Sequence, residues 1–251
     1  MIIKAKQSLG QNFLVDRNTA VRIVDSYDLS TADVVIEIGP GYGVLTNYIA
    51  AQVKTLYAVE IDRRFYELLN EKFKNRRNVV LCHEDILKFD LDKLAESSLR
   101  IVGNIPYHIT SQIFFHMLEY RHRITDIILL MQREVADRIL APPHTKTYGI
   151  FSVISQAYAE VENLMRVPRT VFSPRPKVES AVVRWRFVEE RASAIKNHVF
   201  FRKLVRTAFQ QRRKMLRNSL QPWIDHTHQY ATRRPESITV PEWIELSNEL
   251  I

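Results

Sequence analysis

The chain has 251 residues, of which 46% are hydrophobic and one is cysteine, and it carries a formal net charge of +8. This length allows a full core in one large domain with a smaller one, while the single Cys82 excludes an internal disulfide and a multi-cysteine metal cage, so we expect no metal. No apolar run approaches the roughly 18 residues that span a bilayer, and residues 1–11 lack the apolar stretch of a signal peptide, so we expect a cytoplasmic protein whose basic charge favours a polyanionic partner.

The first stretch of the chain predicts an arm followed by a helix. Residues 4–14 are polar but include Phe13 and Leu14, which favours an arm docked on the protein, where it could cover a ligand. Apolar residues then recur at helical spacing over 18–27, and Asp16 stands where a side chain would cap that helix.

A β-branched run at 34–38 leads directly into Gly39, Gly41 and Gly43 and then into a helix at 44–51. This order is typical of the first unit of a doubly wound α/β sheet, in which the glycines let a ligand approach the backbone. The whole chain has 6 glycines, so the presence of three in one turn indicates a functional site.

The next predicted strand, 56–59, ends in Glu60. This is close to the position, about twenty residues downstream, at which an acidic residue accepts the ribose hydroxyls of a nucleoside. Val44 occupies the place of the third glycine of the dinucleotide-binding pattern, so a smaller adenosine-containing ligand is favoured. The same departure, with no evident catalytic histidine, argues against a nicotinamide-dependent dehydrogenase.

Two further strands end in polar residues. After the strand at 79–82, Asp85 could accept hydrogen bonds from an adenine amino group or could cap the next turn, and its position leaves both readings open. After the strand at 99–102 comes Gly103-Asn104-Ile105-Pro106-Tyr107. A carboxamide beside an aromatic ring suits a planar substrate such as a nucleobase, although a plain strand-ending turn uses the same residue types.

A helix is expected after this turn and another over 133–140, with a strand at 127–131 between them. Strands that alternate with helices call for a mostly parallel sheet, wound right-handedly, with ligands across the carboxyl ends of its strands. We therefore expect Glu60, Asp85 and Asn104 to converge from successive strands.

A loop rich in proline and polar residues at 142–149 precedes a predicted helix at 150–158 and predicted strands around 164–167 and 180–187. A last helix is predicted at 242–250.

Between the two later strands lies Phe172-Ser173-Pro174-Arg175-Pro176-Lys177-Val178. Its prolines make the loop stiff. Phe172 could therefore face Tyr107 across a base, or it could be an ordinary core phenylalanine.

The composition becomes basic after Phe187, and no acidic residue lies between Glu190 and Asp225. Apolar residues at helical spacing are interleaved there with Lys196, Arg202, Lys203, Arg206, Arg212, Arg213, Lys214 and Arg217. We expect one helix with an inward apolar face and an outward basic face that contacts RNA or DNA phosphates, in preference to a face that is merely solvated.

Five stretches, in order over residues 6–220, resemble the KsgA-type ribosomal RNA adenine dimethyltransferases: Gly10-Gln11-Asn12-Phe13-Leu14, Glu37-Ile38-Gly39-Pro40-Gly41, Asn104-Ile105-Pro106-Tyr107, Phe172-Ser173-Pro174-Arg175-Pro176-Lys177-Val178-Glu179-Ser180 and Phe209-Gln210-Gln211-Arg212-Arg213-Lys214. The resemblance implies an α/β protein with a Rossmann-like S-adenosylmethionine-dependent methyltransferase sheet at 1–187 and a small, basic, all-helical RNA-binding domain at 188–251. It also implies a monomeric enzyme that dimethylates the exocyclic N6 of two adjacent adenosines of 16S rRNA in an assembling small ribosomal subunit.

By the same resemblance, the cofactor contacts Asn12, Leu14, Gly39, Gly41, Glu60, Ile61, Asp85, Ile86 and Asn104. The implied catalytic residues are Asn104, Pro106, Tyr107 and Phe172. The Asn104 oxygen and a carbonyl at Ile105 or Pro106 would accept the adenine amino hydrogens, and the two rings would hold the base. The implied RNA-binding residues are Arg175, Lys177, Arg206, Arg212, Arg213, Lys214 and Arg217. His108 stands where many relatives have asparagine, which leaves the local hydrogen bonding open.

Two related functions are the alternatives. Large-subunit rRNA adenine methylases that confer antibiotic resistance share the Asn-x-Pro-aromatic motif, but the basic segment at 210–216 favours the small-subunit group. A non-catalytic nucleic-acid-binding relative is the other, and the retained Glu60, Asp85 and Asn104 favour an enzyme.

Overall fold

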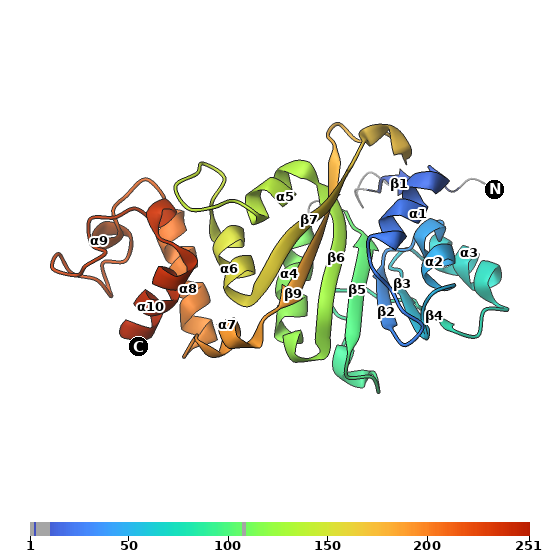
Figure 1. The fold of residues 1–251 in the computed structure, drawn as a ribbon, viewed down its shortest axis with the longest axis horizontal. Helices are drawn as coiled ribbons and strands as arrows, with labels where there is room; N and C mark the ends of the chain where they lie inside the picture. The colour runs from blue at the N-terminus through green and yellow to red at the C-terminus, as the bar shows by residue number, and fades with distance from the viewer. Residues whose placement is uncertain (1–2, 4–10, 107–108) are drawn as a thin grey trace. The chain divides into compact units, whose positions relative to one another are not determined.

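The computed structural model of the chain describes residues 3, 11–106 and 109–251 (Figure 1). The fold divides into two compact units, Met1–Arg133 with Asn163–Arg184, and Glu134–Glu162 with Trp185–Ile251. This division differs from the expected boundary at residue 187, because residues 134–162 make their contacts with the C-terminal residues.

A 7-stranded sheet has the order β4-β3-β2-β5-β6-β9-β7 (Figure 1). Its strands are β2 (Val34–Ile38), β3 (Thr55–Val59), β4 (Val79–Cys82), β5 (Leu99–Asn104), β6 (Ile124–Gln132), β7 (Ala159–Val167) and β9 (Ser180–Phe187). The strands from β4 to β6 pair in parallel, with Ile38 opposite both Val59 and Gly103. Their carboxyl ends therefore meet at one edge, and the expected doubly wound α/β architecture is confirmed.

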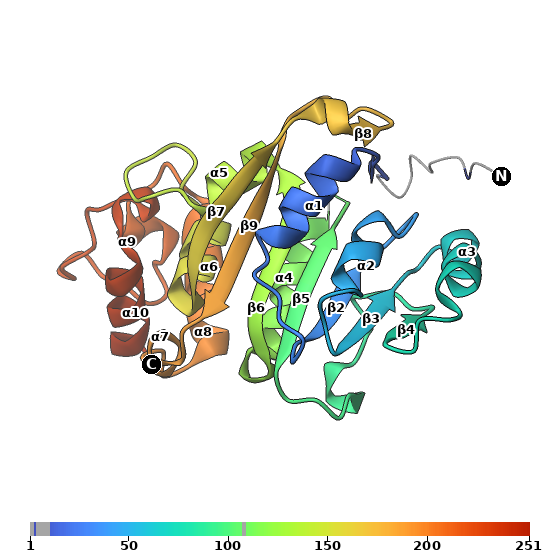
Figure 2. The ribbon, with the colours of Figure 1, turned by 45° about the vertical axis from the view of Figure 1, so that its right-hand side comes forward.

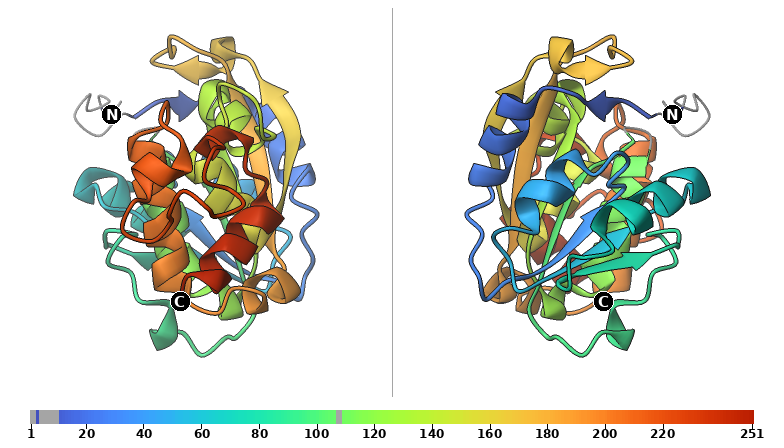
Figure 3. Two further views of the ribbon diagram at one scale, coloured as in Figure 1. Left: turned by 90° about the vertical axis from the view of Figure 1, so that its left-hand side faces the viewer. Right: turned by 90° about the vertical axis from the view of Figure 1, so that its right-hand side faces the viewer.

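Helices cover both faces of the parallel strands, with α1 and α2 on one face and α4 on the other (Figure 2). The right view of Figure 3 faces the edge formed by α3 and β4. The helices of this unit are α1 (Arg17–Asp25), α2 (Val44–Ile49), α3 (Arg63–Phe73) and α4 (Thr110–Glu119), with short 3-10 helices η2 (Leu91–Lys93), η4 (Arg121–Arg123) and η5 (Arg169–Val171). Asp16 begins α1 by accepting a hydrogen bond from the Thr19 N–H at 2.7 Å, as its place in the sequence predicted.

The end of the N-terminal arm is docked as a strand. β1 (Phe13–Leu14) pairs antiparallel with β8 (Phe172–Ser173), with Leu14 opposite Phe172 (Figure 2). The Val15 N–H continues this pairing by donating to the Val171 carbonyl at 2.9 Å. The docked arm predicted from Phe13 and Leu14 is confirmed for the described residues.

The second unit is built mainly of helices (Figure 3, left). They are α5 (Arg133–Ile139), α6 (Ile150–Tyr158), α7 (Glu189–Ser193), α8 (His198–Gln210), α9 (Leu216–Ser219), η6 (Pro235–Ser237) and α10 (Val240–Glu249). Trp185, Phe201 and Trp243 are completely buried in this unit, and α10 packs on α8 and α6. Within residues 3, 11–106 and 109–251, no helix has the length and apolar character needed to cross a bilayer.

The expected basic helix is shorter than predicted. α8 ends at Gln210, and residues 211–215 form a turn before α9. The Arg212 guanidinium stabilises this turn, because it pairs with Glu236 at 2.8 Å and donates to the Thr145 and Lys146 carbonyls at 3.0 and 2.5 Å. The prediction of one helix with a continuous basic face is therefore wrong beyond Gln210.

A buried charge cluster joins the amino-terminal ends of the central strands. Arg100 at the start of β5 donates to both carboxylate oxygens of Asp126 on β6, at 2.9 and 2.7 Å, and to Asp33 at 2.8 Å. The Arg184 Nε atom on β9 lies 3.5 Å from Asp126 Oδ2, which also accepts a hydrogen bond from Arg100. Asp126 is 2% exposed, so its charge is neutralised by these guanidinium groups and not by water.

Replacing Asp126 with asparagine should lower the free energy of unfolding by about 3 kcal/mol, because two buried guanidinium groups lose their shared counter-charge. Urea unfolding followed by circular dichroism measures the change. The control is Arg63→Gln, which breaks a pair with Glu67 whose side chains are 78% and 61% exposed; it should change stability by less than about 0.5 kcal/mol. Equal effects of the two substitutions would contradict the role of the cluster.

Candidate active site

A cavity of about 230 Å³ opens at the carboxyl ends of β2, β3 and β5. Its walls come from residues 11–14, 37–42, 44–45, 59–61, 84–87, 104–106 and 109, all in the first unit. Every residue predicted to contact a cofactor lines it: Asn12, Leu14, Gly39, Gly41, Glu60, Ile61, Asp85, Ile86 and Asn104. The structure thus brings together residues that the sequence spreads over more than ninety positions.

Glu60 holds the glycine turn in place. Glu60 is buried, with 4% of its surface exposed. One carboxylate oxygen accepts the Gly41 N–H at 3.1 Å, and the other accepts the Asp62 N–H at 2.8 Å. Burial raises the pKa of this carboxyl, and the hydrogen bonds from Asp62 and Gly41 oppose the rise. Each oxygen keeps a further lone pair, so the carboxylate that shapes the loop can also accept hydroxyl groups of a ligand.

The arm lies directly on the glycine turn. Gly41 has φ +55°, and a Cβ atom there would lie 2.9 Å from the Phe13 ring. Phe13 also packs edge-on against Tyr42 and at a tilt against Phe65, with ring centroids 4.9 and 5.0 Å apart. Lys72 of α3 donates to the Tyr42 carbonyl at 2.8 Å. Glycine is needed at this position for both the backbone conformation and the contact with the arm.

Asn104, at the end of β5, faces the arm through its amide nitrogen, which donates to the Asn12 carbonyl at 3.0 Å. A carbonyl can only accept, so this bond fixes which end of the amide is the NH₂ group and leaves the oxygen as an acceptor for other partners. The close approach of β5 to β2 depends on Gly103, where a Cβ atom would lie 2.8 Å from the Ile38 carbonyl oxygen.

Asp85 has one of its two predicted roles, capping of the next turn, and this role is compatible with the other, acceptance of a hydrogen bond from an adenine amino group. One carboxylate oxygen accepts the Leu87 N–H at 3.0 Å, which is the loop-capping role. The same residue lines the cavity, as do the exposed Ile61 and the buried Ile86. A carboxylate has two oxygens, so capping with one leaves the other able to accept an amino group.

Glu37, which is not among the predicted cofactor contacts, also lines the cavity. It is 1% exposed, and its Oε2 atom has no hydrogen-bond partner among the described residues. Burial raises its pKa to about 7, and the nearby charge of Glu60 adds to the rise. The sequence carried a signal, because Glu37 is the single charged residue in the otherwise apolar β2, whose residues are all buried.

Of the two rings expected to hold a base, Phe172 is the one that lies within the described residues. Tyr107 and His108 lie outside that range, so their expected roles stay predictions. Phe172 is 4% exposed and belongs to a hydrophobic cluster with Leu14, and it does not line the cavity that Pro106 lines. In this structure Phe172 is therefore an ordinary core phenylalanine, the second of the two predicted alternatives.

The expected RNA-binding residues differ in the exposure of their side chains and in the partners that those side chains already have. Arg175, Lys177, Arg206, Arg213 and Lys214 are exposed. Arg217 is half-buried, and Arg212 is committed to Glu236 and to two backbone carbonyls.

The parallel strands β4 to β6, with the pocket across their carboxyl ends, form a Rossmann-like fold that solved methyltransferase structures share. The family described as ribosomal RNA adenine dimethylase matches residues 2–246 of the sequence. The chain therefore belongs to the ribosomal RNA adenine dimethylase family, and the expected enzyme class, an rRNA adenine dimethyltransferase, is confirmed.

The relatives cover almost the whole chain. It is 44% identical to "Ribosomal RNA small subunit methyltransferase A" of Prosthecochloris aestuarii, over 96% of this chain and 92% of the relative. It is 38% identical to the protein of the same name from Bacillus pumilus, over 98% and 91%.

Two solved structures share the fold. A dimethyladenosine transferase from Plasmodium falciparum has a TM-score of 0.82 at 21% identity, covering 94% of this chain and 96% of that one. The 23S rRNA methyltransferase ErmE has a TM-score of 0.70 at 27% identity, covering 95% and 99%.

The raised pKa of Glu37 predicts a pH dependence of stability in the ligand-free protein. The folded state keeps the Glu37 proton up to about pH 7, whereas the unfolded state releases it near 4.5. Its contribution to stability therefore falls as pH rises between these values and is constant above them. Glu37→Gln should remove this fall, so the variant should match the parent near pH 4 and exceed it at pH 8 by about 3 kcal/mol.

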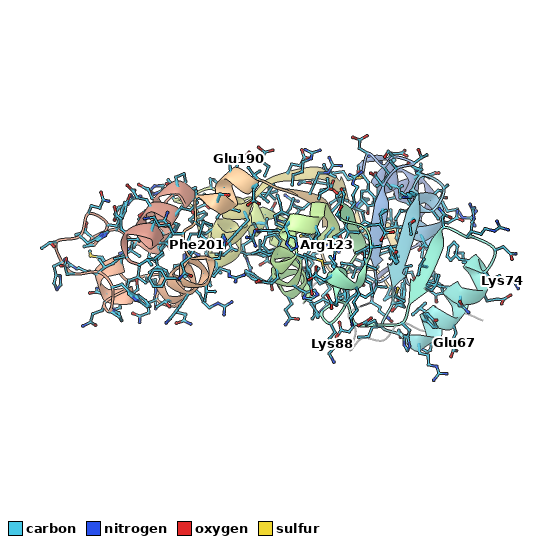
Figure 4. All side chains as sticks on the ribbon, turned by 90° about the horizontal axis from the view of Figure 1, so that it is seen from below. Glu67, Lys74, Lys88, Arg123, Glu190 and Phe201 are labelled. Carbon is cyan, nitrogen blue, oxygen red and sulfur yellow. The ribbon has the colours of Figure 1, made fainter. Side chains whose placement is uncertain are left out.

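Urea titrations from pH 4 to pH 8 measure this difference. The control is Glu67→Gln on the exposed side of α3 (Figure 4), which should follow the parent at every pH. A Glu37→Gln variant whose stability runs parallel to that of the parent would show that the carboxyl is ionised throughout.

Proposed function

We propose that this enzyme transfers methyl groups from S-adenosylmethionine to the exocyclic N6 atoms of two adjacent adenosines in small-subunit ribosomal RNA. The observation that carries the proposal is Asn104, which lines a nucleoside-sized pocket with its amide oriented by Asn12. The relatives at 38% and 44% identity support the choice of subunit, since both are named for the small subunit.

The polar groups of the pocket fit S-adenosylmethionine part by part. Glu60 offers acceptors to two ribose hydroxyls, and the second oxygen of Asp85 offers one to the adenine amino group. The unpartnered buried oxygen of Glu37 suits a positively charged ammonium group. At Gly39 a Cβ atom would meet nothing within 4 Å, so the turn leaves open space there for a ligand. When bound, this cofactor supplies a methyl group activated by a sulfonium.

Asn104 would prepare the target nitrogen. The lone pair of an adenine amino group is delocalised into the ring, which makes the group a poor nucleophile. An acceptor at its N–H bonds draws the hydrogens into position and returns electron density to nitrogen, and no strong base is needed beforehand. The Asn104 oxygen and the carbonyl of Ile105 or Pro106 are the acceptors we assign, and orientation supplies most of the rate.

The base would be held by Tyr107 and Phe172, as the resemblance implies. Stacking on aromatic rings contributes about 1–3 kcal/mol per base. Phe172 is 4% exposed in the core cluster that contains Leu14, so stacking on a base requires its ring to become uncovered.

Methylation of large-subunit rRNA is the second candidate, because ErmE shares the fold at a TM-score of 0.70. Its identity of 27% is well below that of the small-subunit relatives.

The substrate test is direct. The enzyme is incubated with methyl-labelled S-adenosylmethionine and either unmethylated small subunits or large subunits, and the labelled nucleotides are mapped by mass spectrometry. We expect two adjacent dimethyladenosines in small-subunit rRNA. Label in the large subunit would support the second candidate, and cofactor binding without transfer would indicate a binding protein.

Asn104→Ala should lower kcat by at least about 100-fold, because the target amine loses its orienting acceptor. The protein should remain folded, since Asn104 is half-buried at a cavity and not in the core. Single-turnover methyl transfer on small subunits measures the loss. Asn70→Ala, at an exposed position of α3, is the matched control and should retain full activity. Normal turnover by the Asn104 variant would remove Asn104 from the mechanism.

The exposed cations of the second unit should grip RNA phosphates. Replacing Arg206, Arg213 and Lys214 together by glutamine should weaken small-subunit rRNA binding and flatten the slope of log K against log salt by roughly two units, because fewer counterions are released. Filter binding at several salt concentrations measures the slope. Arg212 is kept, since it stabilises the turn.

The control for net charge is a triple variant of the first unit that also removes three positive charges: Arg63→Gln with Arg76→Gln and Arg77→Gln. All three positions are exposed. Equal slopes for the two triple variants would show that the RNA responds to overall charge and not to the second unit.

A further inference from the structure

A second cavity lies wholly within the second unit and takes no part in the proposed reaction. It measures about 940 Å³, and its walls include Leu140, residues 156–157 of α6, residues 159–161 of β7, and parts of α7 and α10. We call this the α10 groove. Its volume lies within the range of ligand pockets, so the chemistry of its walls decides what it can bind.

The floor of the α10 groove is aliphatic. Val161, Val240 and Ile244 line it and are only half-buried, so apolar surface remains uncovered. The amide side chains in the wall are already engaged within the unit: Gln156 donates to the carbonyls at 139 and 141, and Asn248 donates to the carbonyl at 194. The groove therefore offers apolar contact as its main attraction for uncharged groups.

The rim of the α10 groove is acidic. Glu160, Glu190 and Glu245 line it against one cation, Arg191. The Arg191 guanidinium donates to the Ala159 carbonyl at 2.8 Å and lies 3.9 Å from Glu160, so it is part of the wall. Figure 4 labels Glu190 on α7. The groove thus has a net negative charge within a chain of +8.

This sign of charge selects the occupant. Carboxylates repel the phosphates of RNA, which the exposed arginines and lysines elsewhere in the unit attract. They attract lysine and arginine side chains, whose heads would sit on the rim while aliphatic neighbours fill the floor.

The wall formed by β7 adds a further feature. β7 is the terminal strand in the sheet order, and no described strand lies beyond it. An edge strand presents main-chain donors and acceptors to which an extended peptide can pair. An extended protein segment can use this edge, whereas a nucleic acid strand cannot extend the sheet.

We propose that the α10 groove binds a lysine- and arginine-rich segment of another protein in the small-subunit particle, with aliphatic side chains seated on Val240 and Ile244. The particle as the source of this partner rests on the proposed function, whereas the chemistry of the groove does not. Docking here would add a protein contact to the RNA contacts of the same unit and so help the enzyme to distinguish one assembling particle from another.

A peptide-binding experiment tests the groove independently of methyl transfer. The probe is a fluorescein-labelled peptide KRLKLRLKR, and its binding to the full chain is measured by fluorescence anisotropy. The double variant Glu160→Gln with Glu190→Gln should weaken binding about tenfold, within the range measured for two exposed charge pairs. Ile244→Ser should weaken it as well. Replacing the leucines of the peptide by serine should weaken binding to the parent protein.

The matched control is Glu67→Gln with Glu71→Gln, which removes two exposed carboxylates from α3 of the first unit. Peptide binding should be unchanged in this variant. Equal weakening by both double variants, or no weakening by the groove variant, would overturn the proposal, whatever the outcome of the methylation test.

The source of the partner is tested in the particle. A photo-crosslinking p-benzoylphenylalanine replaces Ala194, an exposed residue of the groove wall, and the enzyme is irradiated on small-subunit assembly particles. Mass spectrometry should identify a basic segment of a particle protein as the crosslinked product. A crosslink to rRNA, to a second copy of this chain or to no component would overturn the assignment of the partner.

Discussion

The buried carboxylate of Glu60 organises the functional edge of the sheet. A carboxylate with 4% of its surface exposed must be compensated by hydrogen bonds, and the N–H groups of Gly41 and Asp62 supply them. These two donors belong to the turn after β2 and to the start of α3, so one side chain ties two loops to the end of β3. Loss of that tie would release the glycine turn that forms part of the cavity wall.

The arm depends on this edge and completes it. Phe13 rests on Gly41 in a space that a larger residue would fill, and the Asn12 carbonyl accepts the amide hydrogen of Asn104. The contact that holds the arm is therefore the same contact that orients the amide proposed to act on the substrate. Pairing of β1 with β8 extends the coupling to Phe172, because a ring opposite Leu14 is drawn into the core.

The charged side chains of the second unit fall into two groups, those with partners in their own unit and those that are exposed. Arg212 and Arg191 bind backbone carbonyls and glutamates of their own unit, so they are structural. Arg206, Arg213 and Lys214 are exposed, as the proposed contact with RNA phosphates requires. The α10 groove of the same unit has carboxylates and aliphatic side chains in its walls, so one helical unit carries both an acidic groove and exposed basic side chains.

The sequence alone determined the local parts of this protein. Hydrophobic periodicity and capping residues located most strands and helices, including β4, α6 and β9 with their observed bounds, because those signals depend on neighbours in the chain. The order of glycines and acidic residues after successive strands also predicted the pocket, since parallel strands place their carboxyl ends together. Tertiary contacts decided what sequence order cannot encode. The path of the Arg212 turn follows from Glu236 and from carbonyls some 66 residues away. The burial of Phe172 follows from an arm that pairs with it across the fold. The charge of Glu37 became significant once burial had removed water from it, because the same carboxylate in an exposed strand would carry an ordinary pKa.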